Sequence, residues 1–326
     1  MLWKYGLAPV RTQNLMHTAI GKFLRMYQPP YFPFSDLTVT AADVGLLETT
    51  GVTGQQLLAK NGLDGHFAEE IIQASTRVNY ASNLGLIHGL ETLVCMAATE
   101  GLQIAGGNWQ IFKKMLDSSK AKVHKSTVVS KLEKTPKGTW RVYSSPADAN
   151  GGSHVRVTEF DAVILATPYQ YAEIEISPAP VKVPDTIPYA SLHVTLFTSP
   201  NKLSPKYFGM LEGQGVPGVI LTTLNATEQK NEAIKRGEGI HGVGNVGFYS
   251  ISTLREIKKA GQPVEYLYKV FSPDDFTNER INKIIGVEGA GSEKITWTHR
   301  KIVGFLTDDG TGNSRLTVLI VELIPS

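Results

Sequence analysis

The stretch from Gly101 to Leu132, GLQIAGGNWQIFKKMLDSSKAKVHKSTVVSKL, restricts the fold of this chain more than any other part of its sequence. A short apolar run ends in Gly106 and Gly107, a segment with helical spacing of apolar residues follows, and a valine-rich strand pattern closes the stretch. Glycine permits close backbone approach, and the first turn of a helix presents N–H groups without intrahelical partners. This order predicts an α/β fold. The glycine pair is either a simple strand–helix turn or a turn that contacts a ligand.

Apolar spacing divides the rest of the chain into two parts. From Arg11 to about Glu100, apolar residues recur every three or four positions, which indicates amphipathic helices. From about Ala121 onward, strand-like runs alternate with Gly, Pro and Asn turns. One run, DAVILATP from Asp161 to Pro168, has the composition of a buried strand that ends in a small-residue turn. It is either an ordinary buried parallel strand or one that carries its turn against a cofactor.

The segment RGEGIHGVGNVGFYS, from Arg236 to Ser250, contains the spacing G-x-G-x-x-G twice. In dinucleotide-binding proteins this motif follows a buried strand and opens a helix whose N-terminus faces the pyrophosphate. Here a polar, helix-like segment precedes the glycines and a strand pattern follows them, so the order is reversed. The sequence therefore predicts a flexible loop, not a dinucleotide site, at this position.

Charge and composition exclude several classes of function. Lys and Arg number 32 against 30 Asp and Glu, and a net charge of +2 does not favour a nucleic-acid partner or binding to an anionic membrane. The single cysteine, Cys95, excludes an internal disulfide framework and a cysteine-based metal cluster, and its apolar neighbours predict a core position. His88, in the same apolar pattern, is expected to be a core histidine and not a base. No run reaches the ~18 apolar residues of a transmembrane segment.

Seven sequence blocks are similar, in order, to those of one enzyme family. They are MLWKYG at Met1, RVNYASN at Arg77, GGNWQIF at Gly106, DAVILATP at Asp161, LTTLN at Leu221, YKVFSPD at Tyr268 and ITW at Ile295. From Met1 to about Lys301 the sequence resembles the prenylcysteine oxidase (prenylcysteine lyase) family of FAD-dependent thioether oxidases. The resemblance implies an α/β, two-domain, FAD-dependent amine-oxidase-like fold.

The resemblance and the apolar patterns together predict four segments. Residues 1–100 are the helical part of a substrate domain, and residues 101–168 are a remnant of an FAD-binding domain. Residues 169–301 are the antiparallel-sheet part of the substrate domain, and residues 302–326 are a tail outside the family. The family's Gly-rich strand–turn–helix, which holds the ADP half of FAD, is not identified in the sequence as written. The dinucleotide-binding domain is therefore expected to be incomplete.

The resemblance also implies a reaction. In this family FAD removes a hydride from the prenyl carbon next to sulfur, and the products are free cysteine, a prenyl aldehyde and hydrogen peroxide. The implied partners are a small-molecule prenylcysteine, carrying farnesyl or geranylgeranyl and released from prenylated proteins, and molecular oxygen. The alternative is a flavin-free product without catalysis that at most binds a prenyl group or a protein. Another amine-oxidase-like flavoenzyme is disfavoured because the seven blocks are specific.

Candidate site residues follow from the same resemblance, without a catalytic base and without a metal site. The expected FAD contacts are Gly106, Gly107, Asn108, Val128, Ala166, Thr167 and Pro168. The candidates for binding the amino-acid end of the substrate are Arg77, Asn79 and Tyr80. An arginine suits a bidentate grip on a carboxylate, although a surface or capping role is equally compatible with these residues.

Two further groups of residues are candidates. The aromatic segment Phe23–Phe34 and the helix around Leu90–Met96 line a prenyl slot or belong to the core. Asn225, in the triplet NAT, is a candidate glycosylation site. The resemblance implies a lysosomal or vacuolar protein, and the N-terminal sequence as written shows no signal-peptide pattern.

The incomplete flavin site leads to one further expectation. A flavin pyrophosphate needs a helix N-terminus and glycine-loop amides, and neither is identified in the sequence for this role. We therefore expect the chain as written to be colourless. We also expect poor solubility, because the apolar faces of DAVILAT and of the GGNWQIF helix lack partners.

Overall fold

The computed structural model describes residues 2–97, 102, 104–148, 154–186, 191–287, 294–303 and 321–322 of the 326-residue chain. They form a mixed α/β protein with two compact units, which confirms the predicted fold class. The first unit combines Met1–Glu100 with Ala190–Gly304, and the second combines Gly101–Tyr189 with Phe305–Ser326. The Gly101–Tyr189 part of the second unit is therefore inserted into the sequence of the first.

The helical half of the first unit contains most of the predicted helices. They are α1 (Leu2–Tyr5), α2 (Ala8–Arg25), α3 (Leu37–Asp43), α4 (Leu47–Thr50), α5 (Gly54–Lys60), the π-helix η1 (Ala68–Ile72), α6 (Gln73–Tyr80) and α7 (Gly89–Ala97). Met16 and Ala19 of α2 pack with Leu57 of α5 and Leu93 of α7 in one buried cluster. The helical spacing of the sequence is thus confirmed, because its apolar positions face this cluster.

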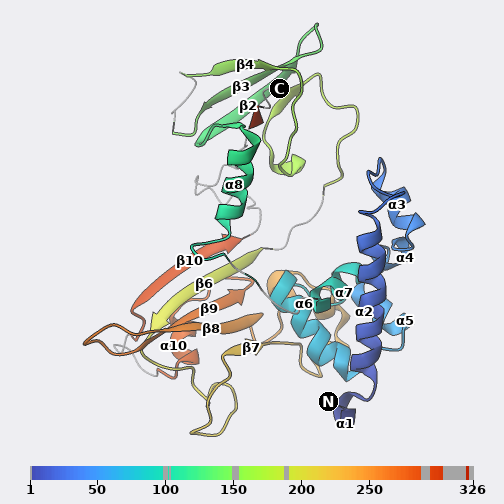
Figure 1. The fold of residues 1–326 in the computed structure, drawn as a ribbon. Coiled ribbons are helices and arrows are strands. Elements are labelled where there is room, and N and C mark those ends of the chain that lie inside the picture. Colours follow the sequence, from blue (N-terminus) through green and yellow to red (C-terminus); the bar gives the residue numbers. More distant parts are fainter. Residues whose placement is uncertain are drawn as a thin grey trace. The chain divides into compact units, whose positions relative to one another are not determined.

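The other half of the first unit is an antiparallel sheet with the strand order β10-β6-β9-β8-β7 (Figure 1). The strands are β6 (Leu192–Ser199), β7 (Val219–Leu221), β8 (Ser250–Ile257), β9 (Glu265–Ser272) and β10 (Trp297–Val303). Between them lie η3 (Glu228–Lys230), α9 (Glu232–Lys235), η4 (Gly239–His241) and α10 (Asn278–Ile284). The rings of Phe197 and Tyr268 stack at 4.9 Å between β6 and β9, and Ile281 and Ile284 of α10 belong to the same buried cluster.

The second unit contains a four-stranded sheet with the order β4-β3-β2-β5. Its elements are α8 (Trp109–Ser119), β1 (Lys122–Val123), β2 (Thr127–Lys134), β3 (Trp140–Pro146), β4 (Arg156–Phe160), η2 (Tyr169–Tyr171), β5 (Glu175–Ser177) and β11 (Val321–Glu322). β5 runs parallel to β2, the other pairs of this sheet are antiparallel, and β11 pairs with β1. Val129, Leu132 and Val142 form the buried cluster of this sheet.

The segment Asp161–Pro168 is not a strand, and this corrects the sequence prediction. Its residues are irregular, and Ile164 is 83% exposed. A strand needs a neighbour for its backbone hydrogen bonds, and the edge of β2 is taken by β5. Because β5 belongs to this sheet, the second unit continues to Tyr189, beyond the boundary predicted after Pro168.

Helix α8 has no buried residue. Trp109, Phe112 and Met115 are each more than half exposed. An apolar face of this kind was predicted for the helix, and the structure confirms the exposure, whereas the poor solubility expected from it stays a prediction.

In the part of the chain that the structure describes, no helix combines the length and the apolar character that crossing a membrane requires. The same residues contain no group of three or more His, Cys, Asp and Glu side chains that is arranged to hold a metal ion.

Candidate functional site

Arg77 connects helix α6 to the glycine-rich loop of the same unit, and its side chain is completely buried. Nη1 donates to Asn83 Oδ1 at 3.0 Å and to the Gly242 carbonyl at 3.3 Å. Nη2 donates to Thr222 Oγ1 at 3.0 Å and to the Val243 carbonyl at 2.8 Å. Only Nε has no hydrogen-bond partner among the described residues. The guanidinium therefore joins segments that lie far apart in the sequence.

The charge of Arg77 is balanced mainly by dipoles. Burial lowers its pKa to about 10, so the guanidinium stays protonated at neutral pH. Its carbon lies 5.2 Å from the centre of the Tyr249 ring. Among the described residues it forms no ion pair with a carboxylate, although buried Glu228 favours its charged form at longer range. The carbonyls of the loop are thus its principal partners.

The loop between α9 and β8 is ordered, which corrects the prediction of a flexible loop. A Cβ added at Gly242 would lie 1.9 Å from the Gly237 carbonyl oxygen, so two turns of the loop are in direct contact. Glu228 Oε1 accepts the Asn245 N–H at 2.7 Å. β8 follows the glycines, as the sequence pattern predicted, and the motif does not open a helix.

The three residues proposed for the amino-acid end of the substrate are separated by the helix. Arg77 faces the interior, whereas Asn79 is exposed and donates from Nδ2 to the Ser75 carbonyl at 3.0 Å. Tyr80 is half-buried, and burial raises its pKa. Because both Nη atoms of Arg77 are bonded to the protein's own atoms, the structure gives Arg77 a different role from the predicted carboxylate grip. The roles of Asn79 and Tyr80 stay predictions.

The predicted glycine turn precedes α8. Gly106 and Gly107 have φ angles of +86° and +114°, which L-residues rarely adopt. The Gly107 N–H donates to the Ile104 carbonyl at 2.8 Å, and Asn108 Oδ1 accepts the Ile104 N–H at the same distance. A Cβ at Gly107 would lie 2.7 Å from Trp109 Cδ1. The turn therefore requires glycine for its own geometry, and its contact with a cofactor stays a prediction.

The other predicted flavin contacts lie in and after the four-stranded sheet. Val128 is half-buried in β2 and pairs with Ser145 of β3. Ala166 is exposed, and Thr167 and Pro168 are half-buried before η2. Thr167 Oγ1 is buried without a hydrogen-bond partner among the described residues. A buried hydroxyl without a partner costs free energy, so this atom suits a contact with a ligand.

The turn at Gly106–Gly107, strand β2 with Val128 and the segment with Thr167 all belong to the second unit. In the described part of the chain, no hydrogen bond or ring contact links the turn at Gly106–Gly107 to Val128 or to Thr167. Their chemistry is nevertheless suitable for a flavin. The glycines have no Cβ and precede a helix, and Thr167 has an unused hydroxyl.

Asn225 is exposed in the turn that precedes η3. Its Oδ1 accepts the N–H groups of Thr227 and Glu228, both at 2.9 Å. The side-chain nitrogen Nδ2, the atom to which an N-linked glycan is attached, takes part in none of the hydrogen bonds of the described residues. The geometry is therefore compatible with the predicted modification, which stays a prediction.

The sequence predicted core positions for His88 and Cys95, and the structure confirms only that of Cys95. His88 is half-exposed, and its Nδ1 accepts the Glu91 N–H at 3.2 Å at the start of α7, so it caps a helix. Cys95 is buried as predicted, and its thiol donates to the Thr92 carbonyl at 3.0 Å. Burial raises the pKa of Cys95 to about 12, which keeps the thiol protonated and unreactive at neutral pH.

Residues 1–301 match the family model described as prenylcysteine lyase. The chain belongs to the prenylcysteine lyase family. The membership predicted from seven sequence blocks is thus confirmed. A farnesylcysteine lyase from Arabidopsis thaliana is 28% identical over 229 residues, which cover 67% of this chain and 42% of the relative. The chain therefore spans less than half the length of this curated relative.

Two solved structures of putrescine oxidase variants, from a redesign of cofactor binding, are similar to this prenylcysteine lyase family chain. Both have a TM-score of 0.47, with 10% and 11% sequence identity, and cover 90% of this chain and 60% of their own.

Proposed function

We propose that this protein acts in the oxidative cleavage of farnesyl- or geranylgeranyl-cysteine. The observation that carries the proposal is the family match over residues 1–301. The similarity to a farnesylcysteine lyase supports the substrate class. The products would be cysteine, a prenyl aldehyde and hydrogen peroxide, in the breakdown of prenylated proteins.

The proposed reaction breaks a carbon–sulfur bond without a strong base. Loss of hydride from the prenyl carbon beside sulfur leaves a cation shared between sulfur and the alkene. Water adds to that carbon and loses a proton, and the hemithioacetal collapses to the aldehyde and the free thiol of cysteine. When bound, FAD would supply the hydride acceptor, and oxygen would then take up the two electrons. The polypeptide would contribute orientation and a dry pocket.

Residues of the second unit would hold the flavin. The proposed contacts are Gly106, Gly107, Asn108, Val128, Ala166, Thr167 and Pro168. Gly106 and Gly107 would allow the backbone before α8 to lie close to the cofactor. Thr167 Oγ1 would donate its hydrogen bond to an acceptor of the cofactor, which would remove the cost of a buried, unpartnered hydroxyl.

Residues of the first unit would bind the substrate. Asn79 and Tyr80 would contact its amino-acid end, and Arg77 would act indirectly, by holding the loop at Gly242. The rings of Tyr27, Phe32 and Phe34 lie within 6.3 Å of one another. They are a proposed apolar surface for the prenyl group.

An assay with farnesylcysteine tests the proposal. Flavin-loaded protein should release prenyl aldehyde and hydrogen peroxide in equal amounts, because one hydride transfer yields one of each. Thr167→Val keeps the side-chain shape and removes the hydroxyl, and should weaken flavin retention, measured by visible absorption. Flavin-loaded protein that yields neither product would contradict the proposed reaction.

A flavin-free protein that binds a prenyl group or another protein is the second candidate. The observation that favours it is the exposure of the apolar face of α8 and of Ile164. The visible spectrum of the purified chain separates the two candidates. Bound oxidised flavin excludes the second, whereas a colourless protein that binds farnesylcysteine without converting it excludes the first for this chain.

We also propose that the protein is a lysosomal or vacuolar glycoprotein modified at Asn225. The support is the exposure of Asn225 and the unused Nδ2 atom. Enzymatic removal of N-glycans from protein isolated from its natural source should increase its gel mobility. Asn225→Gln should remove this shift, and an unmodified native protein would refute the assignment.

A further inference from the structure

Strand β4 places polar residues on the face of the sheet that carries the buried cluster. Arg156 pairs with Ser144 and Thr158 pairs with Val142, and both partners in β3 are buried. Because side chains alternate along a strand, Val157 lies on the other face, where it is half-exposed. Arg156 itself is exposed, because β4 is an edge strand of this sheet, so its guanidinium lies outside the core and is accessible to a solute.

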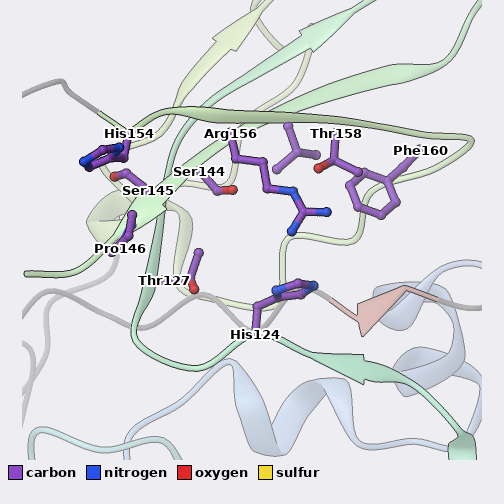
Figure 2. Close-up of a pocket in the computed structure, with 10 residues that line it drawn as sticks. His124, Thr127, Ser144, Ser145, Pro146, His154, Arg156, Thr158 and Phe160 are labelled. Carbon is purple, nitrogen blue, oxygen red and sulfur yellow. The ribbon is translucent and has the colours of Figure 1, made fainter. Parts of the chain in front are cut away.

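A cavity of about 280 Å³ opens at this end of the sheet. It is lined by His124, Thr127, Val142, Ser144, Ser145, Pro146, His154, Arg156, Thr158 and Phe160. Figure 2 shows the Arg156 side chain extending from β4 into this space toward His124, with Thr158 and Phe160 further along the same strand. No carboxylate is among the lining residues, so their ionisable groups are all basic.

The Arg156 guanidinium has no hydrogen-bond or ion-pair partner within the described ranges of the chain. Arg141 lies on the opposite face of the same sheet and forms an ion pair, with its Nη1 3.4 Å from Glu133 Oε2. Of these two neighbouring arginines, the one that lines the cavity is therefore the one free to bind an anion.

The lining side chains match a phosphate group. Seven of them carry polar groups that can donate hydrogen bonds, and these are His124, Thr127, Ser144, Ser145, His154, Arg156 and Thr158. A terminal phosphate offers three strongly accepting oxygens to such donors, whereas a carboxylate offers two. The planar fork of an arginine binds two phosphate oxygens at once. Phe160 and Val142 add an apolar wall that suits the organic part of an ester.

We propose that this cavity binds the phosphate group of a small phosphate ester. The site is independent of the proposed flavin contacts, because it contains none of them. Thr127, which lines it, and Val128, which was assigned to the flavin, point to opposite faces of β2. Failure of the prenylcysteine assay would therefore not affect this proposal.

Titration calorimetry of the full 326-residue chain tests the proposal. The probes are phenyl phosphate and AMP, with phenol and adenosine as uncharged counterparts. We expect saturable binding of at least one ester and none of its counterpart. Tighter binding of AMP supports the site and assigns a nucleotide, whereas tighter binding of phenyl phosphate supports it and assigns a non-nucleotide ester.

Arg156→Gln should weaken the binding of the ester roughly 10- to 100-fold, since it removes one charged pair. Arg141→Gln, on the opposite face, is the matched control and should leave the affinity unchanged. Thermal unfolding followed by circular dichroism verifies that both variants are folded. If Arg156→Gln is unfolded, the loss of ester binding is tested with His124→Gln instead. Absence of binding to the unaltered chain overturns the proposal. Equal losses in Arg156→Gln and Arg141→Gln also overturn it.

Discussion

Arg77→Met is expected to destabilise the first unit by about 3–5 kcal/mol, because it removes the guanidinium donor to the buried Val243 carbonyl and one of the two side-chain donors to the Gly242 carbonyl. Methionine is similar in length and is apolar, so packing is largely kept while the carbonyls of Gly242 and Val243 lose the guanidinium. Urea unfolding followed by circular dichroism measures the change. Two units can unfold in separate steps, so the transition that shifts belongs to the unit that contains α6.

Two companion variants make this result specific. Arg141→Met changes the same kind of side chain at an exposed position and should alter stability by no more than about 0.5 kcal/mol. Arg77→Lys keeps the positive charge but loses the planar guanidinium that bonds several acceptors at once. Its loss of stability should fall between those of Arg141→Met and Arg77→Met. A loss below about 1 kcal/mol in Arg77→Met would mean that the network does not hold the loop.

Gly242→Ala is expected to cost about 3 kcal/mol through steric overlap alone. The φ angle of Gly242 is −107°, so alanine meets no backbone strain there. The added Cβ would lie 1.9 Å from the Gly237 carbonyl oxygen and 2.7 Å from its carbon, and backbone atoms cannot rotate away as a side chain can. The same urea titration should show an earlier transition of the first unit.

Gly218→Ala is the control for this substitution. Nothing lies within 4 Å of the position that its added Cβ would take, and its φ is outside the left-handed region. Its stability should change by less than about 1 kcal/mol. If Gly242→Ala were equally neutral, the close contact between the two turns of the loop would be disproved.

Local patterns predicted the local structure of this chain. The apolar spacing between Arg11 and Glu100 predicted helices there, and α2 is one of them, with Met16 and Ala19 buried. Gly106 and Gly107 precede a helix as expected. The reversed order around the second glycine motif also predicted correctly that a strand follows it.

Long-range partners explain what the sequence did not predict. Thr222 and Gly242, which bond to Arg77, are far from it along the chain, and no local pattern indicates that an arginine followed by VNY will be buried against them. The strand expected at Asp161–Pro168 failed for a related reason, since a strand depends on its neighbour and β5 occupies that place. The sequence could therefore name candidate site residues but could not predict the contacts that they make in the fold.

The insertion of Gly101–Tyr189 into the sequence of the first unit has a consequence for synthesis on the ribosome. Arg77 emerges long before the loop at Gly242, and the whole of Gly101–Tyr189 is made in between. Closing so long a loop is entropically costly and slow, and the guanidinium has no loop carbonyls to bind until then. During synthesis, the helices before Glu100 therefore lack their contacts with the Gly242 loop and the antiparallel sheet until these later segments are made. A ribosome that stalls within the insertion would release a chain that lacks the loop and strands needed to complete its first core.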